Sequence, residues 1–460
     1  MKIKDKLFSN RTLRDGGIYL IANIFNKAIA FITIPVFSRL LTTTEYGEVS
    51  TYSAYVSIIY FFVGIASEYT IRNAYVDYKR RVPQYMSTMF SMTSLITFIC
   101  SIIVVIINSG FIHLTTNIIC LCCVIQAFMT YVNTAMINMY MMEGAVCKRA
   151  IVTAGPNLLS AILGIIFIIS FKSNRAFGRI IGYVCAFVIF GVIELGIIWK
   201  NNKPGIDKNI AKYILKLSPP LIVHGLSVVA LSQIDRVMIT AMRGSSETGV
   251  YSIIYNLSMV ALAVTNALEG VWIPWFTLKY QNKCINEINK KSDEYLKFVC
   301  VLMVAIMLVS PEVLKLLTPK EYWNGINLIP PLVIASFLMY MYSFQISLEL
   351  YEKKTKQIAV ITISAALTNV ILNYILIPYY GALAASFTTV ISYLVSFLLH
   401  ARNGHKIQKD LFPFKQFIVP VIIFVVGIIV FYLFELIFWV RWIVTIIMLI
   451  MLLYYYLKRS

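Results

Sequence analysis

Apolar and polar positions alternate along this chain in long blocks. The apolar blocks reach about 20 residues, the length that a helix needs to cross the hydrocarbon core of a bilayer, and short polar connections separate them. This pattern predicts an all-α, polytopic membrane protein with about 14 transmembrane helices. The predicted spans lie near residues 17–40, 48–71, 85–108, 114–142, 151–171, 176–199, 214–241, 248–277, 293–317, 324–349, 356–377, 380–401, 416–435 and 438–457.

The charges of the connections indicate how these spans are oriented. Of the 460 residues, 59% are hydrophobic and 13% are charged, and the 40 Lys and Arg outnumber the 21 Asp and Glu. Most basic residues fall in every second connection and in the two terminal segments, and basic loops remain in the cytoplasm. We therefore expect both termini in the cytoplasm, and the net charge of +19 requires no nucleic-acid partner. The first apolar run is too long for a signal-peptide core, which favours a retained helix.

A short motif occurs once in each half of the chain. TEYGEVSTY, from Thr44, follows the first predicted span, and SETGVYSII, from Ser246, follows the seventh. Both contain Glu-x-Gly-x-x-Ser at a turn into the next helix, where Glu suits the helix N-terminus and Gly suits the turn. The repeat predicts two pseudo-symmetric six-helix lobes with a substrate site between them. We expect an N-terminal lobe at 1–200, a C-terminal lobe at 201–410 and two extra helices at 411–460.

Charged residues inside the predicted spans are the candidate site, because an isolated charge in hydrocarbon is costly. Lys27 lies near the middle of the first span, and Asn23 and Asn26 share its helix face. One interpretation is a polar patch that faces a watery cavity. The alternative is a lysine satisfied by a carbonyl or an acid on a neighbouring helix. A cation in a cavity would suit a phosphorylated cargo.

Four further charged residues belong to the predicted cavity. Asp235 and Arg236, in the seventh span, could contact the cargo, neutralise each other or brace the lobes. Arg72 could pair with Glu68 one turn before it or guide phosphate into the cavity. Glu269 continues a polar stripe on the eighth span, which favours a cavity-lining role. The other members of this stripe are Tyr255, Ser258, Thr265 and Asn266.

The remaining chemistry-bearing residues predict no catalytic or metal site. The eight cysteines lie mostly in apolar runs and are interpreted as small hydrophobic residues. No Walker-type Gly-rich Lys-Ser/Thr loop occurs in the sequence, so we expect no cofactor. Glu194 and Glu349 lie near predicted cytoplasmic ends, where interfacial solvation is expected. His400 is assigned to a basic cytoplasmic loop.

Three stretches of the chain carry a family resemblance. They are PVFSRLLTTTEYGEVS from Pro35, SQIDRVMITAMRGSSETGVYSIIYNL from Ser232 and NVILNYILIPYYGALAAS from Asn369, in which Ala384 stands where a second glycine is common. In this order they resemble the Wzx-type polysaccharide and O-antigen flippases, an oligosaccharide flippase family of the multidrug/oligosaccharidyl-lipid/polysaccharide (MOP) exporter superfamily.

The resemblance implies a function and a setting. Such proteins carry a polyprenyl-diphosphate-linked oligosaccharide, such as an O-antigen or capsule repeat unit, from the cytoplasmic to the external leaflet of the bacterial inner membrane. Their two lobes enclose a central cavity that opens to each side in turn. The expected partners are this lipid-linked substrate, membrane lipids and, as candidates, a glycan polymerase and the chain-length machinery. We expect the protein to function as a monomer.

Three other functions compete with this interpretation. A multidrug-and-toxin-type cation antiporter would be expected to carry an acid, rather than Lys27, in the first helix. A polysaccharide polymerase or ligase would need a longer external catalytic loop than those predicted here, so we expect no enzyme. A scaffold within a glycan-assembly complex would tolerate substitutions in the cavity, which distinguishes it from a transporter.

Overall fold

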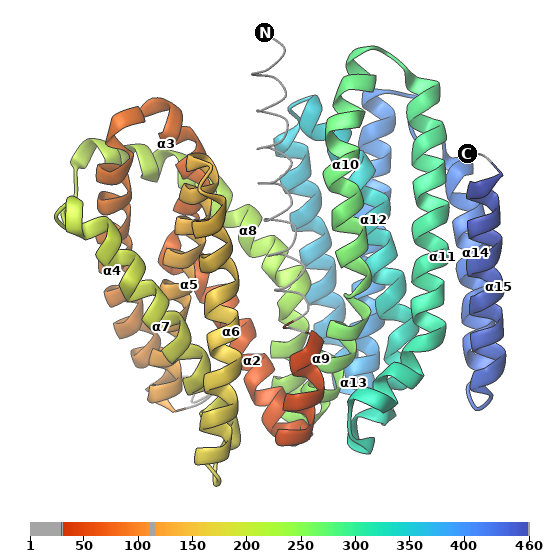
Figure 1. Cartoon of the computed structure of the whole chain (residues 1–460), viewed down its shortest axis with the longest axis horizontal. Helices are drawn as coiled ribbons and strands as arrows, with labels where there is room; N and C mark the ends of the chain where they lie inside the picture. Colours follow the sequence, from red (N-terminus) through yellow and green to blue (C-terminus); the bar gives the residue numbers. More distant parts are fainter. Residues whose placement is uncertain (1–28, 30, 110–115, 459–460) are drawn as a thin grey trace. The chain divides into compact units, whose positions relative to one another are not determined.

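The computed structural model describes residues 29, 31–109 and 116–458, and within these ranges it contains helices and turns but no β-strand (Figure 1). The predicted all-α, polytopic fold class is therefore confirmed. The chain divides into two compact units, unit 1 (Met1–Val229) and unit 2 (Ala230–Ser460). The predicted domain limits at 200 and 410 stay a prediction, as does a central cavity between lobes.

Unit 1 is organised around α5, which packs against α2, α4, α6 and α7. Tyr131 of α5 is fully buried, and its ring stacks on Phe128 and meets the edges of Phe90 and Tyr60. Burial of such aromatic side chains supplies much of the packing energy of a core. The helices are α2 (Thr43–Gly64), α3 (Ile71–Asp77), α4 (Val82–Ile107), α5 (Asn117–Glu143), α6 (Val146–Ser170), α7 (Arg175–Asn201) and the first part of α8 (Lys208–Arg243).

The start of α2 is built by the first copy of the repeated motif. The Glu45 N–H donates to the Thr42 hydroxyl at 3.2 Å, and the Thr42 N–H donates to the Glu45 carboxylate at 2.8 Å. This reciprocal pair is a capping box, which satisfies backbone donors that the helix leaves free. The second copy places Glu247 in the first turn of α9 (Ser245–Ser258). The expected helix starts are thus confirmed.

The end of α2 is a sharp break inside a predicted span. Ile65 and Ala66 both adopt left-handed backbone conformations, with φ of 47° and 53°. A 3-10 turn, η1 (Ser67–Thr70), follows, and α2 and the segment Ser67–Asp77 are bent by 55° relative to each other. The break carries no glycine at the left-handed positions, so the sequence pattern did not predict it.

Unit 2 contains the rest of α8 and seven further helices. α12 packs along α13, and α14 and α15 both pack against α11. In Figure 1 the turns that follow α10 and α12 lie at one end of this unit, and the turns that follow α11 and α14 lie at the other. The helices after α9 are α10 (Ala261–Gln281), α11 (Ile285–Leu317), α12 (Ile329–Tyr351), α13 (Thr355–Ile407), α14 (Ile418–Leu433) and α15 (Phe438–Leu457). Short 3-10 segments are η2 (Lys79–Arg81) in unit 1, and η4 (Lys320–Leu328) and η5 (Phe414–Phe417) in unit 2.

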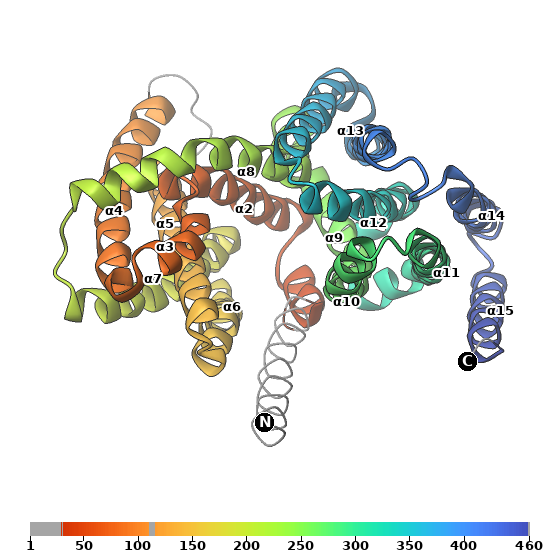
Figure 2. The ribbon, with the colours of Figure 1, turned by 90° about the horizontal axis from the view of Figure 1, so that it is seen from above.

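The continuous stretch α13 is two helices joined at Gly381. This glycine has φ 57° and ψ −137°, a conformation that favours residues without a Cβ atom. The two halves turn away from each other in Figure 2. The break falls next to the predicted boundary between the spans 356–377 and 380–401, so both spans are confirmed.

The number of membrane-crossing helices agrees with the apolar pattern. Ten described helices are long and apolar enough to cross a membrane, or 11 if the bent pair that begins with α2 is one span. α13 is counted once in these numbers although it covers two predicted spans. Each predicted span from 48–71 onward coincides with one or two described helices. Most of the first span lies outside the described residues, and only Phe31–Leu40 of it forms a described helix.

Candidate functional site

A pocket with a partly polar lining lies in unit 2 between α10 and α12. Its volume is about 490 Å³, and apolar side chains and three tyrosines complete its wall. Among the described residues that line it, Glu269 is the only charged one, and the Ser343 side chain lies beside the Glu269 carboxylate. Such a set of acceptors and donors suits a polar, hydroxyl-rich ligand. The polar lining consists of Thr265, Asn266, Glu269, Thr277, Ser343 and Ser347.

The predicted polar stripe on the eighth span reaches this pocket only in part. The span is broken between α9 and α10 at Met259 and Val260. Glu269 and its two nearest stripe members on α10 line the pocket, whereas Tyr255 and Ser258 on α9 are buried and lie outside its lining. The stripe predicted from the sequence is therefore divided between buried residues of α9 and the pocket lining on α10.

Asp235 is the centre of a buried polar network in unit 2. The side chain is 1% exposed. Its carboxylate accepts hydrogen bonds from the Tyr251 hydroxyl at 2.7 Å, the Asn373 amide at 2.6 Å and the Thr389 hydroxyl at 2.9 Å. These donors come from α9 and from both halves of α13. Because a buried carboxylate needs such donors, Asp235 holds three segments together.

Arg236 follows Asp235 in sequence but has a different set of partners. Its Nε donates to the Ser252 hydroxyl at 3.2 Å, and its guanidinium carbon lies 4.7 Å from the centre of the Tyr255 ring. The Nη1 atom also donates to the Ser232 carbonyl and to the Gln233 amide oxygen. Neither Asp235 nor Arg236 lines the pocket of Glu269. These contacts hold segments of unit 2 together, and a role of the pair toward the cargo or between the lobes stays a prediction.

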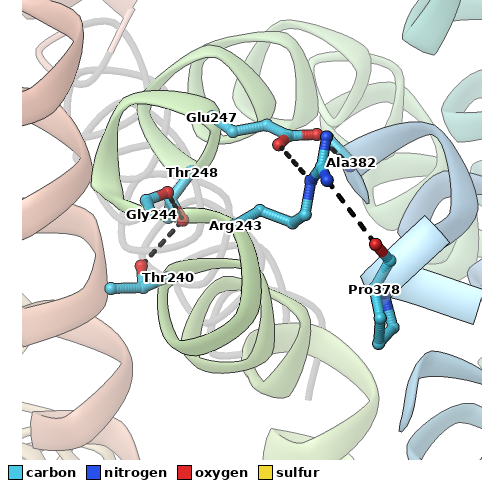
Figure 3. A network of polar contacts seen from close by, with 7 residues as sticks. All are labelled: Thr240, Arg243, Gly244, Glu247, Thr248, Pro378 and Ala382. Carbon is cyan, nitrogen blue, oxygen red and sulfur yellow. Dashed lines mark hydrogen bonds and ion pairs between the residues drawn. The ribbon is translucent and has the colours of Figure 1, made fainter. Parts of the chain in front are cut away.

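A second network joins the turn between α8 and α9 to the break in α13 (Figure 3). Arg243 bonds Glu247 at 3.2 Å and reaches the Pro378 carbonyl at 3.5 Å. The Glu247 carboxylate accepts the Ala382 N–H at 2.6 Å. We call this set the Arg243–Glu247 clasp. It uses the acid of the second repeat copy, and its partners on α13 are main-chain atoms.

Arg72 and Glu68 do not form the predicted local pair. Glu68 is 1% exposed and accepts a hydrogen bond from the Tyr60 hydroxyl at 2.9 Å, while Arg72 is exposed on α3. Glu68 lies in the 3-10 turn η1 and bonds Tyr60 of α2, whereas Arg72 lies on α3. A role of Arg72 toward phosphate stays a prediction. Lys27, Asn23 and Asn26 lie outside the described residues.

Several buried charges were missed by the sequence interpretation. Arg179 and Arg441, near the ends of their spans, were counted as loop charges, but they are 4% and 0% exposed. Arg179 lies between the rings of Phe37 and Tyr183, at 3.9 and 3.8 Å from their centres. Tyr183 lies one turn further along α7, whereas Phe37 comes from another helix, so the pattern of α7 alone does not reveal the second ring of this cation–π arrangement.

The expected interfacial solvation of two glutamates is wrong. Glu194 is 2% exposed and accepts a hydrogen bond from Asn133 at 2.8 Å. Glu349 is fully buried and is bonded by His400 and Asn403, each at 2.7 Å. His400 is itself 1% exposed and belongs to α13, not to a loop. In both cases a partner helix covers the end of the span.

Comparison with known proteins identifies the family. Residues 12–278, more than half of the chain, match the family described as "Polysaccharide biosynthesis protein". The chain belongs to this family. One relative of this chain is the "Lsg locus putative protein 1" of Haemophilus influenzae. The two are 22% identical over 288 residues, which cover 61% of this chain and 70% of that protein.

The fold of this family member is shared with solved MOP transporters. The lipid II flippase MurJ in an inward closed conformation has a TM-score of 0.76 and 14% identity, over 96% of this chain and 99% of MurJ. An inward-facing multidrug resistance MATE family transporter of the MOP superfamily has a TM-score of 0.64 and 13% identity, over 83% and 96%. The family match places the chain in polysaccharide biosynthesis, in agreement with the resemblance given by the sequence, and the fold is similar to that of a solved flippase and a solved transporter.

Proposed function

We propose that this protein moves a polyprenyl-diphosphate-linked oligosaccharide, such as an O-antigen or capsule repeat unit, from the cytoplasmic to the external leaflet of a bacterial inner membrane. It does so by alternating access, with both termini in the cytoplasm and without chemical change of its cargo. The observation that carries the proposal is the pocket between α10 and α12, in a chain that belongs to a polysaccharide biosynthesis family.

The chemistry of the pocket suits the sugar part of such a cargo. Sugar hydroxyls donate to carboxylate and amide oxygens and accept from hydroxyl and amide groups, and Glu269, Asn266 and Ser343 supply both kinds of partner. Tyr342 and Tyr351 add aromatic surface for the C–H faces of the ring. A carboxylate would repel a diphosphate, so this pocket receives the glycan. The diphosphate is assigned to Lys27, whose charge matches it.

The proposal is tested by substitution of the charged residue Lys27. Lys27→Ala and Lys27→Arg are introduced in a strain whose surface glycan depends on this protein, and the glycan is measured at matched expression. Loss of the glycan in the alanine variant with partial retention in the arginine variant supports a charge role. Normal export by a well-expressed Lys27→Ala protein contradicts it, and also favours the scaffold alternative.

One observation favours a second candidate, a multidrug-and-toxin-type cation antiporter. Glu269 is the sole charged residue in the described lining of the pocket, and a lone carboxylate in an apolar setting also suits an organic cation. The two functions differ in a dye-efflux assay. Strong efflux of cationic dyes that requires Glu269 would support the antiporter, whereas glycan loss without dye efflux supports the flippase.

A further inference from the structure

A second, smaller cavity lies at the turn between α14 and α15, beside the end of α11. Its volume is about 220 Å³. It is separate from the pocket of Glu269, which α10 and α12 form. The charge pattern of the connections predicts this turn on the external side of the membrane. The lining residues are Glu312, Lys315, Glu435, Leu436, Phe438 and Arg441.

Arg441 brings unused hydrogen-bond donors to this cavity. The side chain is completely buried, and its Nη2 donates to Glu312. Its Nε and Nη1 atoms have no hydrogen-bond partner among the described residues. A buried donor without a partner costs free energy, and a guanidinium with two free N–H groups matches the oxygens of a phosphate. These two atoms therefore indicate a phosphate-bearing ligand.

The other charges of the cavity restrict the kind of phosphate. Lys315 adds a second cation, but Glu312 and Glu435 add two carboxylates. The Glu312 carboxylate already bonds Arg441 and the Trp442 indole N–H at 3.3 Å, whereas Glu435 is exposed at the turn. A ligand that carries only negative charge would be repelled by Glu435. A ligand with a phosphate and a nearby ammonium group would match both signs.

The surroundings of the cavity indicate a lipid. Leu436 is 94% exposed and Trp439 is 66% exposed beside the charged residues. Exposed apolar side chains continue along α14 and α15, and an exposed tryptophan near the end of a span is typical of the membrane interface. Acyl chains could lie along these faces while the headgroup enters the cavity.

We propose that this cavity binds the headgroup of an ethanolamine phospholipid of the external leaflet. Arg441 and Lys315 receive the phosphate, and Glu435 receives the ammonium group. The apolar faces of α14 and α15 contact the acyl chains. The bound lipid satisfies the two unpaired donors of Arg441 and holds the turn between α14 and α15 against α11.

The test measures lipid retention by the purified full-length protein. Native mass spectrometry is performed after equal exposure to phosphatidylethanolamine and phosphatidylglycerol. The proposal predicts preferential retention of phosphatidylethanolamine, reduced about threefold by Lys315→Gln and by Glu435→Gln, as for exposed ion pairs. The controls are Lys320→Gln and Glu321→Gln, which change exposed charges at the same end of the unit. Arg441 is left intact because its pairing with Glu312 also joins α15 to α11.

Competitors distinguish the sources of the phosphate. Soluble phosphoethanolamine should displace the lipid, and inorganic phosphate at the same concentration should not. Equal retention of the two lipids, competition by inorganic phosphate alone, or equal effects of the test and control variants would overturn the proposal. Loss of preference in Lys315→Gln and Glu435→Gln, with an unchanged melting temperature, would support it independently of any transport activity.

Discussion

At the scale of single residues, Asp235 and Arg236 of unit 2 have separate partners instead of pairing with each other. Asp235 is satisfied by three neutral donors, and Arg236 by carbonyl, amide and hydroxyl oxygens and a ring. Removal of the acid would take an acceptor away from three buried donors, of which Thr389 and Asn373 keep contacts with Ala385 and Asn369. A buried donor that loses its acceptor costs free energy. The stabilising role of Asp235 therefore depends on its oxygens more than on the neighbouring cation.

We expect Asp235→Ala to destabilise the folded protein by about 3 kcal/mol, because three buried donors lose the Asp235 carboxylate as an acceptor at once. Asp293→Ala is the matched control, since Asp293 is partly exposed and pairs with Lys297 across one helical turn. Its loss should cost less than about 1 kcal/mol. Thermal unfolding in detergent compares the two variants, and equal melting temperatures would contradict the bracing role.

The sequence predicts the residue-scale site incompletely, and the reason is physical. A lining position was predicted for Glu269 because its polar neighbours recur at helical spacing along one continuous segment of the sequence. The three partners of Asp235 lie on other helices, and two of them are more than a hundred residues away in the sequence. A one-dimensional pattern indicates that such a charge needs partners but contains no information about which helix supplies them.

At the scale of elements, two turns of unit 2 place lysine where glycine is usual. Lys283 follows α10 and Lys353 follows α12, with φ of 57° and 56°. In each turn the next residue donates its N–H back to the helix, Cys284 to the Lys279 carbonyl and Lys354 to the Glu349 carbonyl. This is the hydrogen-bonding pattern of a helix end that normally has glycine in the left-handed position.

We expect Lys283→Gly and Lys353→Gly each to stabilise the protein by about 1 kcal/mol, because glycine adopts this conformation without strain. Lys290→Gly serves as the control. Lys290 is an exposed lysine inside α11, where glycine should destabilise by about 1 kcal/mol. Melting temperatures should therefore move in opposite directions, and a decrease in all three variants would refute the explanation.

The elements themselves follow from the apolar pattern, whereas their breaks follow only in part. Every predicted span from residue 48 onward corresponds to a helix or a helix pair, since length and hydropathy specify a crossing directly. The break in α13 occurs at a glycine, Gly381, which the sequence shows directly. The breaks at Ile65–Ala66 and Met259–Val260 have neither glycine nor proline, so tertiary packing decides them, and the polar stripe on the eighth span was misplaced for this reason.

At the scale of the whole molecule, the family match assigns the chain to polysaccharide biosynthesis. The fold is shared with a lipid flippase and with a drug transporter, so the fold alone does not select the cargo. Selection must come from the polar groups of the pocket. The acid of unit 2 and the lysine predicted in the first span would then contact different parts of one substrate.

We expect Glu269→Gln to reduce surface glycan by about tenfold, since an amide retains one acceptor but loses the charge-assisted hydrogen bonds to sugar hydroxyls. Glu269→Leu should abolish export, because it retains no acceptor. Glu287→Gln, in an exposed pair with Lys279 outside the pocket, is the control and should export normally. Glycan quantification at matched protein levels checks this, and full export by Glu269→Leu would exclude the pocket as a glycan site.

The Arg243–Glu247 clasp has a consequence for how the protein can diverge. Since the atoms it contacts at positions 378 and 382 belong to the peptide backbone, the clasp itself does not depend on which side chains stand there. The sole replacement at 382 that deletes the donor is proline, which has no N–H. Related sequences should therefore vary at position 382 but should not have proline there, and the arginine and the glutamate should change only together.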